Sequence, residues 1–436
     1  MEPRSERNST LQTTPGLYIP EAGFDARRTA IGFTVLALAW LALIAPLMIA
    51  DVWDETAGLQ LFRDPSSSFA GDAELIWRQS IGLWRPLPSW IAAAVIRASP
   101  SFDSAWLTLR WLNALLIVTS AGLLTLAFIR WRMDLSPHPL WLPLLLLFSS
   151  GSISSATWFA AIFDVFVLFF LAAGVLCLAQ RSPSVAGILF GVAFFCKETA
   201  ILLFPLIAIL WSAGRITARD AVRASIPPVF LGAVYFFLRG SRIRLGSGED
   251  IHQFDIEQFG ASLLGMADSF WIGALKTDGP ILLGVLVLLA SLAALRSWKV
   301  RGMALMLVLL AAAIYWGMFA QWQGGIVLSH LNFVGRLYLI PVTIAILALA
   351  LDGRRWVFPL ILLVGTTGAA LTWRDHQRFQ RAYRAAYELG SSSSVSVRID
   401  YAERPLTDGR RNLEIGSFPD AAWTFDAREA KLTRRR

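Results

Sequence analysis

The sequence predicts an all-α, polytopic membrane protein with about 11 transmembrane helices. Three observations predict this fold class: 56% of the 436 residues are hydrophobic, only 16% are charged, and the mean hydropathy is +0.55. Soluble domains are about 45–50% apolar and about 25% charged, so the composition excludes a water-soluble globular protein. The apolar residues also stand in blocks long enough to cross the roughly 30 Å hydrocarbon core of a bilayer.

The expected elements follow from apolar blocks that charges interrupt. A polar N-terminal tail, 1–28, precedes the first block, 29–50, which has the length of a span and no small-residue cleavage site after it, so it is interpreted as a signal anchor. The first outer loop, 51–104, contains an amphipathic interfacial helix at 86–98. The remaining expected spans are 105–129, 141–148, 158–179, 185–196, 200–211, 226–238, 281–295, 304–319, 337–350 and 357–371.

These spans form one membrane domain, 29–373, which a C-terminal segment, 374–436, follows. That segment opens with a helical, amphipathic run at 377–389 and continues with four consecutive serines, which are typical of a linker. Two interpretations of the segment stay open, a small extramembrane domain and a partly disordered tail.

Charge predicts the orientation and excludes one class of partner. The net charge is +8, but many basic residues flank apolar blocks, where the positive-inside rule and anionic lipids account for them, so no nucleic acid partner is expected. The same rule favours a cytoplasmic N-terminus. The two cysteines, Cys177 and Cys196, lie in apolar stretches, and His138 and His330 have no companions at metal-ligand spacing. No cofactor is therefore predicted and no ligand cluster is seen, while a divalent metal stays an open alternative.

An acidic cluster opens the first outer loop. Asp51, Asp54 and Glu55 directly follow the first span. A carboxylate at a membrane boundary can take the proton of an acceptor hydroxyl, because low-dielectric surroundings raise its basicity. The alternative is a set of ordinary interfacial acids.

Charged residues also stand at positions where an apolar sequence is expected. Arg85 precedes the amphipathic helix, where a guanidinium suits a pair of phosphate oxygens, although a snorkelling arginine explains it too. Asp164 lies inside the fourth span, either as a functional acid or as the partner of another buried polar group. Lys197 and Glu198 separate two half-length blocks, which predicts two short helices that meet at a polar elbow lining a cavity.

A last pair of candidates opens a late span. Arg336 and Tyr338 belong to the segment Gly-Arg-Leu-Tyr-Leu-Ile-Pro at 335–341. Both side chains are expected at interface depth, as membrane anchors or as ligand contacts.

The order of these motifs resembles the glycosyltransferase-C superfamily over residues 30–345. The motifs are the acid pair after the first span, Arg-Pro-Leu before an amphipathic helix, an aspartate in the fourth span, Lys-Glu between paired short helices, and Arg-x-Tyr-x-x-Pro at a late span. Within the superfamily the chain is most similar to polyprenyl-phosphate-sugar-dependent protein O-mannosyltransferases and, more distantly, to lipid A aminoarabinose transferases.

The resemblance implies an integral-membrane glycosyltransferase of the bacterial inner membrane with its active site on the extracytoplasmic side. Its donor would be a polyprenyl-phosphate sugar, and its acceptor a protein, glycan or lipid hydroxyl. Asp54 matches the catalytic acid of the family, with Glu55 as the competing choice of general base. Arg85, Lys197 and Arg336 match basic positions that hold the donor phosphate, and Asp51, Asp164, Glu198 and Tyr338 are expected to support them.

The sequence departs from the family at 150–155, Ser-Gly-Ser-Ile-Ser-Ser, where relatives often carry His-Pro-x-His. The metal or acceptor chemistry of those relatives therefore does not carry over. Competing functions are a lipid-linked polysaccharide polymerase or ligase, a transporter or flippase that uses Asp164 and Lys197 as a charge relay, and a catalytically inactive scaffold.

Overall fold

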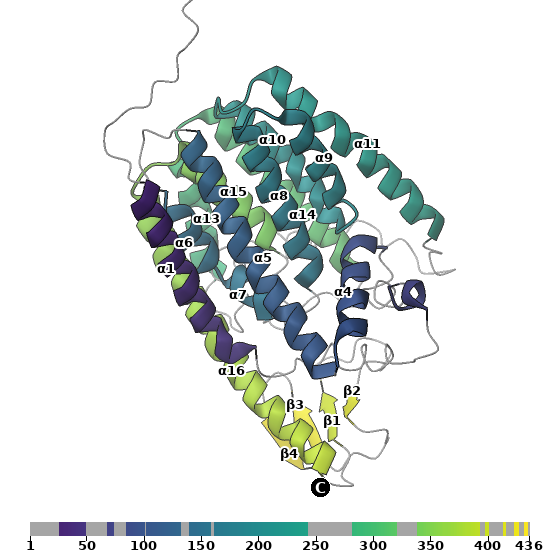
Figure 1. Cartoon of the computed structure of the whole chain (residues 1–436). Helices are drawn as coiled ribbons and strands as arrows, with labels where there is room; N and C mark the ends of the chain where they lie inside the picture. Colours follow the sequence, from purple (N-terminus) through teal and green to yellow (C-terminus); the bar gives the residue numbers. More distant parts are fainter. Residues whose placement is uncertain are drawn as a thin grey trace, which may run out of the picture.

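The structure is a computed structural model of the whole chain, and it is described here for residues 26–48, 68–73, 84–100, 102–131, 139–157, 161–242, 281–320, 338–392, 397–400, 413–415, 423–426 and 431–434. Figure 1 shows a bundle of helices with a small sheet below it. The helices are α1 (Ala26–Ile44), η1 (Ala45–Leu47), α4 (Pro86–Ala98), α5 (Phe102–Arg130), α6 (Trp141–Leu147), α7 (Ser150–Thr157), α8 (Ile162–Ala179), α9 (Pro183–Ala193), η4 (Glu198–Leu202), α10 (Leu203–Ser212), α11 (Ala218–Arg242), α13 (Ile281–Ala294), α14 (Trp298–Ala320), α15 (Leu339–Asp352) and α16 (Val357–Ser392).

The helical class is confirmed, but the expected count of about 11 spans is not. Within the described ranges four helical segments are long and apolar enough to cross a membrane: Arg27–Leu47, Leu107–Arg130, Ile162–Ala179 and Ala218–Arg239. Five further apolar helices are shorter than a usual crossing: Pro183–Ala193, Glu198–Ser212, Val285–Ala294, Leu339–Asp352 and Val357–Leu371.

The block at 141–148 is not a span by itself. It forms the seven-residue helix α6, and the chain continues after a turn into α7, whose eight residues are all buried. Some hydroxyls of this segment are satisfied by nearby backbone: Ser152 Oγ donates to the carbonyl of Leu146 at 2.6 Å, and Thr157 Oγ1 donates to that of Ile153 at 3.0 Å. Among the described residues Ser154 Oγ and Ser155 Oγ are buried without a hydrogen-bond partner. The sequence pattern missed α7 because its residues are polar.

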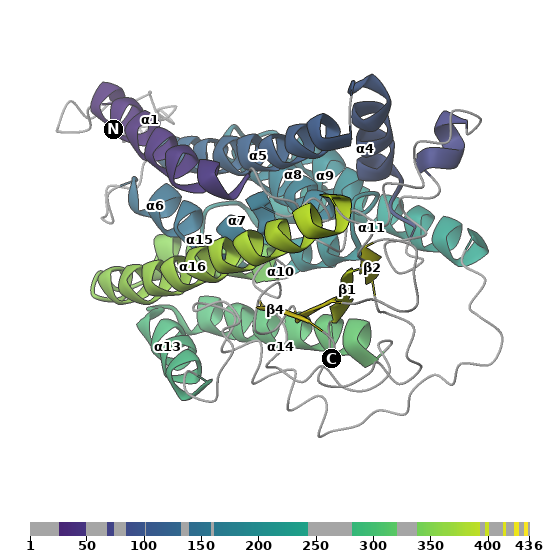
Figure 2. The ribbon, with the colours of Figure 1, turned by 90° about the horizontal axis from the view of Figure 1, so that it is seen from below.

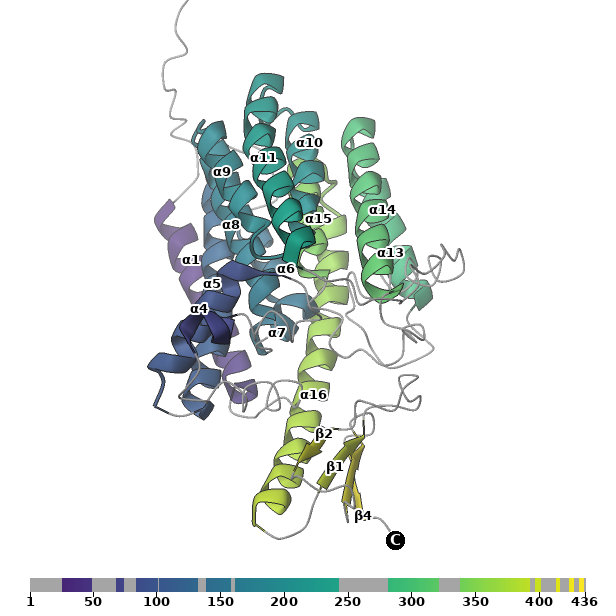
Figure 3. The ribbon, with the colours of Figure 1, turned by 90° about the vertical axis from the view of Figure 1, so that its right-hand side faces the viewer.

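The elbow expected between 185–196 and 200–211 is confirmed. Helix α9 ends at Ala193, Lys197 has an extended backbone with φ −165° and ψ 147°, and η4 begins at Glu198. Helix α10 then continues the chain in the opposite direction from α9 (Figure 3).

Glycines let three of these helices pack closely. A Cβ at Gly187 of α9 would come within 2.8 Å of the Ala224 carbonyl oxygen of α11, and one at Gly191 would come within 2.5 Å of Leu231. Gly187 and Gly191 are four residues apart, the spacing of the small-residue motif that joins membrane helices. A Cβ at Gly174 of α8 would overlap the ring of Phe190. Helices α8, α9 and α11 therefore form one tightly packed unit.

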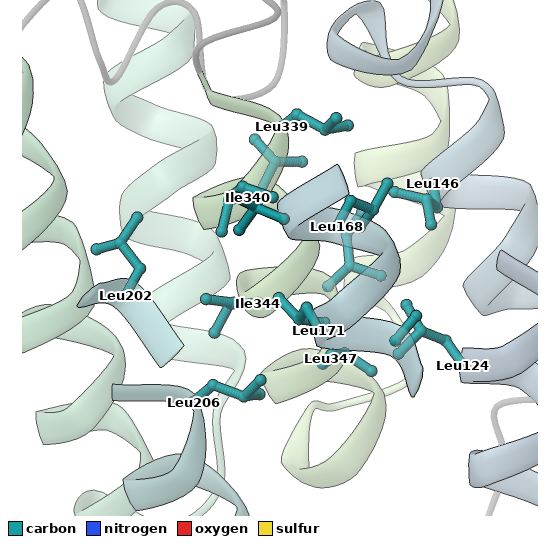
Figure 4. Packing of buried hydrophobic residues seen from close by; sticks show 14 of the residues in the cluster. Leu124, Leu146, Leu168, Leu171, Leu202, Leu206, Leu339, Ile340, Ile344 and Leu347 are labelled. Atoms are coloured by element: carbon teal, nitrogen blue, oxygen red, sulfur yellow. The ribbon is translucent and has the colours of Figure 1, made fainter. Parts of the chain in front are cut away.

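Helix α15 lies at the centre of the apolar core. Figure 4 shows its side chains beside Leu168 and Leu171 of α8 and near Leu202 and Leu206 of the η4–α10 segment. Helix α15 packs against α8, η4 and α10. This packing fixes the N-terminal end of α15 next to the elbow.

Helix α16 runs past the bundle into the C-terminal segment (Figures 1 and 2). The expected last span and the expected amphipathic run are thus one continuous helix of 36 residues. It packs against a four-stranded sheet of order β2-β1-β3-β4, in which β1 pairs parallel with β3 and the other pairs are antiparallel. The strands are β1 (Val397–Asp400), β2 (Leu413–Ile415), β3 (Trp423–Asp426) and β4 (Lys431–Arg434). The C-terminal segment is therefore not purely helical, which corrects the all-α expectation there.

The two ends of the bundle differ in charge. The turns after α5, α8, α10, α13 and α15 lie at one end of the bundle (Figures 1 and 3), where backbone hydrogen bonds join the turn after α13 to the turn after α15. We call it the basic end, after the residues Arg130, Arg181, Arg215, Arg219, Arg223, Arg296, Lys299, Arg301, Arg354 and Arg355 in and beside these turns. The elbow at Lys197 and the N-terminus of α8 lie toward the opposite end, as does the sheet.

Candidate functional site

Five charged side chains converge toward the end of the bundle opposite the basic end. Arg85 precedes α4, Asp164 lies in the first turn of α8, Lys197 and Glu198 form the elbow before η4, and Arg239 lies near the end of α11. The contacts Lys197–Asp164, Arg85–Glu198 and Arg239–Glu198 join them into what we call the charged cluster.

Lys197 and Asp164 form a sealed ion pair. Lys197 Nζ donates to both carboxylate oxygens of Asp164, at 2.8 and 2.7 Å, and the two side chains are only 3% and 2% exposed. A lone charge at this depth is costly, so each group needs the other. Asp164 is thus the partner of a buried polar group, which was one of its two predicted roles.

Arg85 and Glu198 form a second, two-pronged pair. Arg85 Nη2 donates to Oε1 of Glu198 at 2.6 Å and Nε donates to Oε2 at 3.3 Å. Burial is the largest single influence on the pKa of Arg85 and lowers it, but the charge and hydrogen bonds of Glu198, together with the nearby Tyr235 and Asp164, leave this pKa above its ordinary value. The guanidinium also lies over the ring of Phe163, 5.2 Å from its centroid. Arg85 is therefore a fixed cation.

Arg239 is the less enclosed cation of the cluster. Its Nη1 lies 4.0 Å from Oε2 of Glu198, and its side chain is 19% exposed. With all five groups in their ordinary ionisation states, three cations face two carboxylates. Counted over the described residues, the charged cluster therefore carries one excess positive charge, which suits an anionic ligand.

Aromatic packing holds the segment before α4 against the elbow. Tyr235 Oη donates to the carbonyl of Trp84 at 3.0 Å, and the two rings stack with centroids 5.8 Å apart. The Leu87 amide donates to the carbonyl of Phe195 at 3.2 Å, and the Phe195 ring meets that of Trp84 edge to face. These contacts place Arg85 where Glu198 can hold it, although the two are 113 residues apart in sequence.

The residues on either side of the segment between η1 and α4, the expected first outer loop, are anchored in a similar way. Arg110 of α5 is fully buried, and its Nη1 donates to the carbonyl of Met48 at 3.3 Å. This bond ties the end of the first helix to α5, while Trp84 and Arg85 tie the other end of the loop to α11 and the elbow.

The predicted site residues divide into two groups. Arg85, Asp164, Lys197 and Glu198 are brought together as described. The buried Tyr338 occupies the N-cap position of α15, which packs against α8 and η4. The predicted Asp51, Asp54, Glu55 and Arg336 lie outside the described residues.

Sequence reasoning did not select Arg239 and Tyr235. Both lie toward the end of an apolar block, where an arginine and a tyrosine are typical interface anchors. The available signal was the repeat of aromatic residues at 235–237 directly before Arg239. Among the described residues no group of three His, Cys, Asp or Glu side chains could hold a metal ion.

Comparisons of the chain with protein-family models, with curated proteins and with solved structures give no match.

Proposed function

We propose that this chain is a multi-pass membrane glycosyltransferase that moves a sugar from a polyprenyl-phosphate donor to an acceptor hydroxyl. The observation that supports this function best is the charged cluster, with its excess positive charge at the end opposite the basic end. If the basic end faces the cytoplasm, as the positive-inside rule favours, the cluster faces the extracytoplasmic side. That is where the sugar of such a lipid would be presented in a bacterial inner membrane.

The reaction needs a base and a cationic hold on the leaving group. The acceptor oxygen attacks the anomeric carbon, the bond from this carbon to the phosphate oxygen breaks, and polyprenyl phosphate leaves with the electron pair. The configuration at the anomeric carbon inverts. The acceptor proton passes to the general base, for which Asp54 is our first choice and Glu55 the second.

We expect the cations of the cluster to stabilise the departing phosphate. The carboxylates fix the ammonium and guanidinium groups in place, so positive charge is preorganised near the phosphate oxygen on which negative charge develops. Nε and Nη2 of Arg85 donate hydrogen bonds to Glu198. Within the described ranges no hydrogen bond of Nη1 is seen, so this nitrogen can donate to a phosphate oxygen. Lys197 has a third N–H beyond the two that Asp164 accepts. Arg336 would complete the set.

The test of this function is an assay of the purified protein in nanodiscs with a panel of polyprenyl-phosphate sugars and with release of polyprenyl phosphate as the readout. Asp54→Asn should bind the donor yet turn over about 10²-fold more slowly, because an amide cannot take the proton. Glu55→Gln should be milder. Full activity in both variants and in their double variant would remove the acid pair from the mechanism.

Two further variants complete the assay. Asp51→Asn, alone and combined with Asp54→Asn, tests whether this neighbouring carboxylate substitutes for a lost base. Asp220→Asn is the matched control, because Asp220 lies at the basic end and an asparagine serves equally well beside Thr217 at the start of α11. This control should keep full activity.

A transporter or flippase is the second candidate, because the sealed Lys197–Asp164 pair is the kind of intramembrane charge pair that relays use. Reconstituted vesicles distinguish the two functions. A transporter moves an unchanged lipid or solute across the bilayer, whereas the proposed enzyme releases polyprenyl phosphate. A lipid-linked polysaccharide polymerase or ligase would instead require a diphosphate donor in the same assay.

A further inference from the structure

An apolar groove runs along the outside of the bundle between α10 and α11. Its volume is about 650 Å³, and of the eleven residues that line it only Ser225 is polar. The Ser225 hydroxyl already donates its hydrogen bond to the carbonyl of Ala221 at 2.8 Å, so an occupant of the groove need not supply an acceptor for it. Large apolar side chains stand exposed along its walls, among them Trp211 at 52% and Phe230 at 66%. The apolar lining of this groove suits the hydrocarbon chain of a lipid.

The groove leads toward the charged cluster. Phe204 and Ala233 line it on the two helices, and from there α10 leads back through η4 to Glu198, while α11 continues to Tyr235 and Arg239. Arg239 follows the groove-lining Ala221 by about five helical turns, so both lie on the same side of α11. A chain in this groove would therefore bring its polar head close to Arg239.

Charge decides what kind of head fits there. The cluster has one cation more than it has carboxylates, and Arg239 is its less enclosed member. An uncharged head would leave this excess positive charge of the described residues unbalanced, because Glu198 already pairs with Arg85, whereas a phosphate would neutralise it.

We infer that the groove between α10 and α11 holds the hydrocarbon chain of a polyprenyl phosphate and that Arg239 binds its phosphate. The inference rests on the proposed function, because it makes the occupant the lipid part of the sugar donor and of the product. It assigns Arg239 as a phosphate-binding residue in addition to Arg85 and Lys197.

The experiment measures binding of two probes to the purified full chain in nanodiscs, undecaprenyl phosphate and the much shorter geranyl phosphate. Ala208→Trp fills the groove one helical turn beyond Phe204, at a level that we expect only the long chain to reach. This variant should weaken binding of undecaprenyl phosphate about tenfold and leave binding of geranyl phosphate unchanged. Arg239→Gln should weaken both about tenfold, a loss of roughly 1.4 kcal/mol.

Matched controls separate these effects from misfolding. Val185 of α9 is 50% exposed and does not line the groove, so Val185→Trp adds the same bulk elsewhere on the surface. Arg355 lies exposed at the basic end, so Arg355→Gln removes a charge far from the cluster. Both controls should bind the two probes as the parent chain does, and all variants should elute as one species.

Each other outcome overturns a defined part of the inference. Unchanged binding of undecaprenyl phosphate to Ala208→Trp removes the groove, and unchanged binding to Arg239→Gln removes the headgroup contact. Equal binding of uncharged undecaprenol, or equal competition by phosphatidylglycerol, makes the groove an ordinary lipid contact. The expected binding pattern without any sugar transfer in the assay above would instead refute the proposed function and leave the lipid site standing.

Discussion

Removal of the Lys197 charge should destabilise the protein more than almost any other single substitution. Lys197→Met keeps much of the side chain's length but leaves the Asp164 carboxylate 2% exposed without its cation. The methionine also removes both hydrogen bonds that Asp164 accepts from Nζ. The perturbation therefore isolates one buried charge.

The size of the effect follows from burial. Breaking a buried ion pair by removing one partner costs about 3–5 kcal/mol, because the remaining charge is uncompensated. Asp164→Leu should lower the free energy of unfolding by a similar amount, because it leaves the buried Lys197 ammonium without a counterion. If the two losses were independent, the double variant would lose about 6–10 kcal/mol, the sum of two such values. Because the double variant has no stranded charge, we expect it to be within about 2 kcal/mol of the parent.

The assay is unfolding in mixed micelles with increasing denaturing detergent, followed by the fluorescence of the 18 tryptophans. Arg355→Met is the control for an exposed charge. Arg355 lies exposed at the basic end, so this substitution should change the free energy of unfolding by no more than about 0.5 kcal/mol.

Two results would refute the reasoning. If Lys197→Met unfolds at the parent's midpoint, the pair is not sealed as the structure has it. If the double variant loses the sum of both single losses, the two residues do not compensate one another. A stable double variant without donor binding would, in addition, separate the structural role of the pair from its role toward phosphate.

Two further predictions concern the packing around the charged cluster. Gly187→Ala should destabilise the protein by about 1–3 kcal/mol, because its Cβ would press on the Ala224 carbonyl oxygen. Gly302→Ala, in α14 with nothing within 4 Å, should be neutral or stabilising by up to about 1 kcal/mol in the same unfolding assay, and equal losses at both glycines would contradict the packing. Tyr235→Phe keeps the stack on Trp84 and loses two hydrogen bonds of the hydroxyl, one to the Trp84 carbonyl and one with Arg239, so unfolding should be easier by about 1–3 kcal/mol. An unchanged unfolding midpoint would show that these bonds do not hold the segment.

The sequence allowed the unusual residues of the site to be predicted, but not their pairing. Arg85, Asp164, Lys197 and Glu198 were selected because charges are rare inside apolar blocks. Which charge meets which depends on packing between segments 33 and 113 residues apart, and no local pattern encodes that.

The helices were predictable where composition and burial agree. The elbow at Lys197 was predicted because central charges are incompatible with a single lipid-facing helix. Helix α7 was missed because its buried residues include four serines and a threonine, which do not register as an apolar pattern. The sheet after α16 was missed because its strands are three or four residues long, too short for alternation to be informative.

The exposures of the three cations indicate from which side a ligand reaches the cluster. The side chain of Lys197, which contacts Asp164 of α8, is 3% exposed, that of Arg85 is 6% exposed, and that of Arg239 on α11 is 19% exposed. The exposed fraction of the cations therefore increases from α8 toward α11. The sealed pair satisfies the innermost charges, the two-pronged pair fixes the next cation, and the excess charge lies toward the outermost one. An anion that enters beside α11 therefore meets Arg239 first and needs to displace neither carboxylate. Since the apolar groove leads to the same side of α11, an amphiphile with a phosphate head can reach the cluster laterally from the membrane.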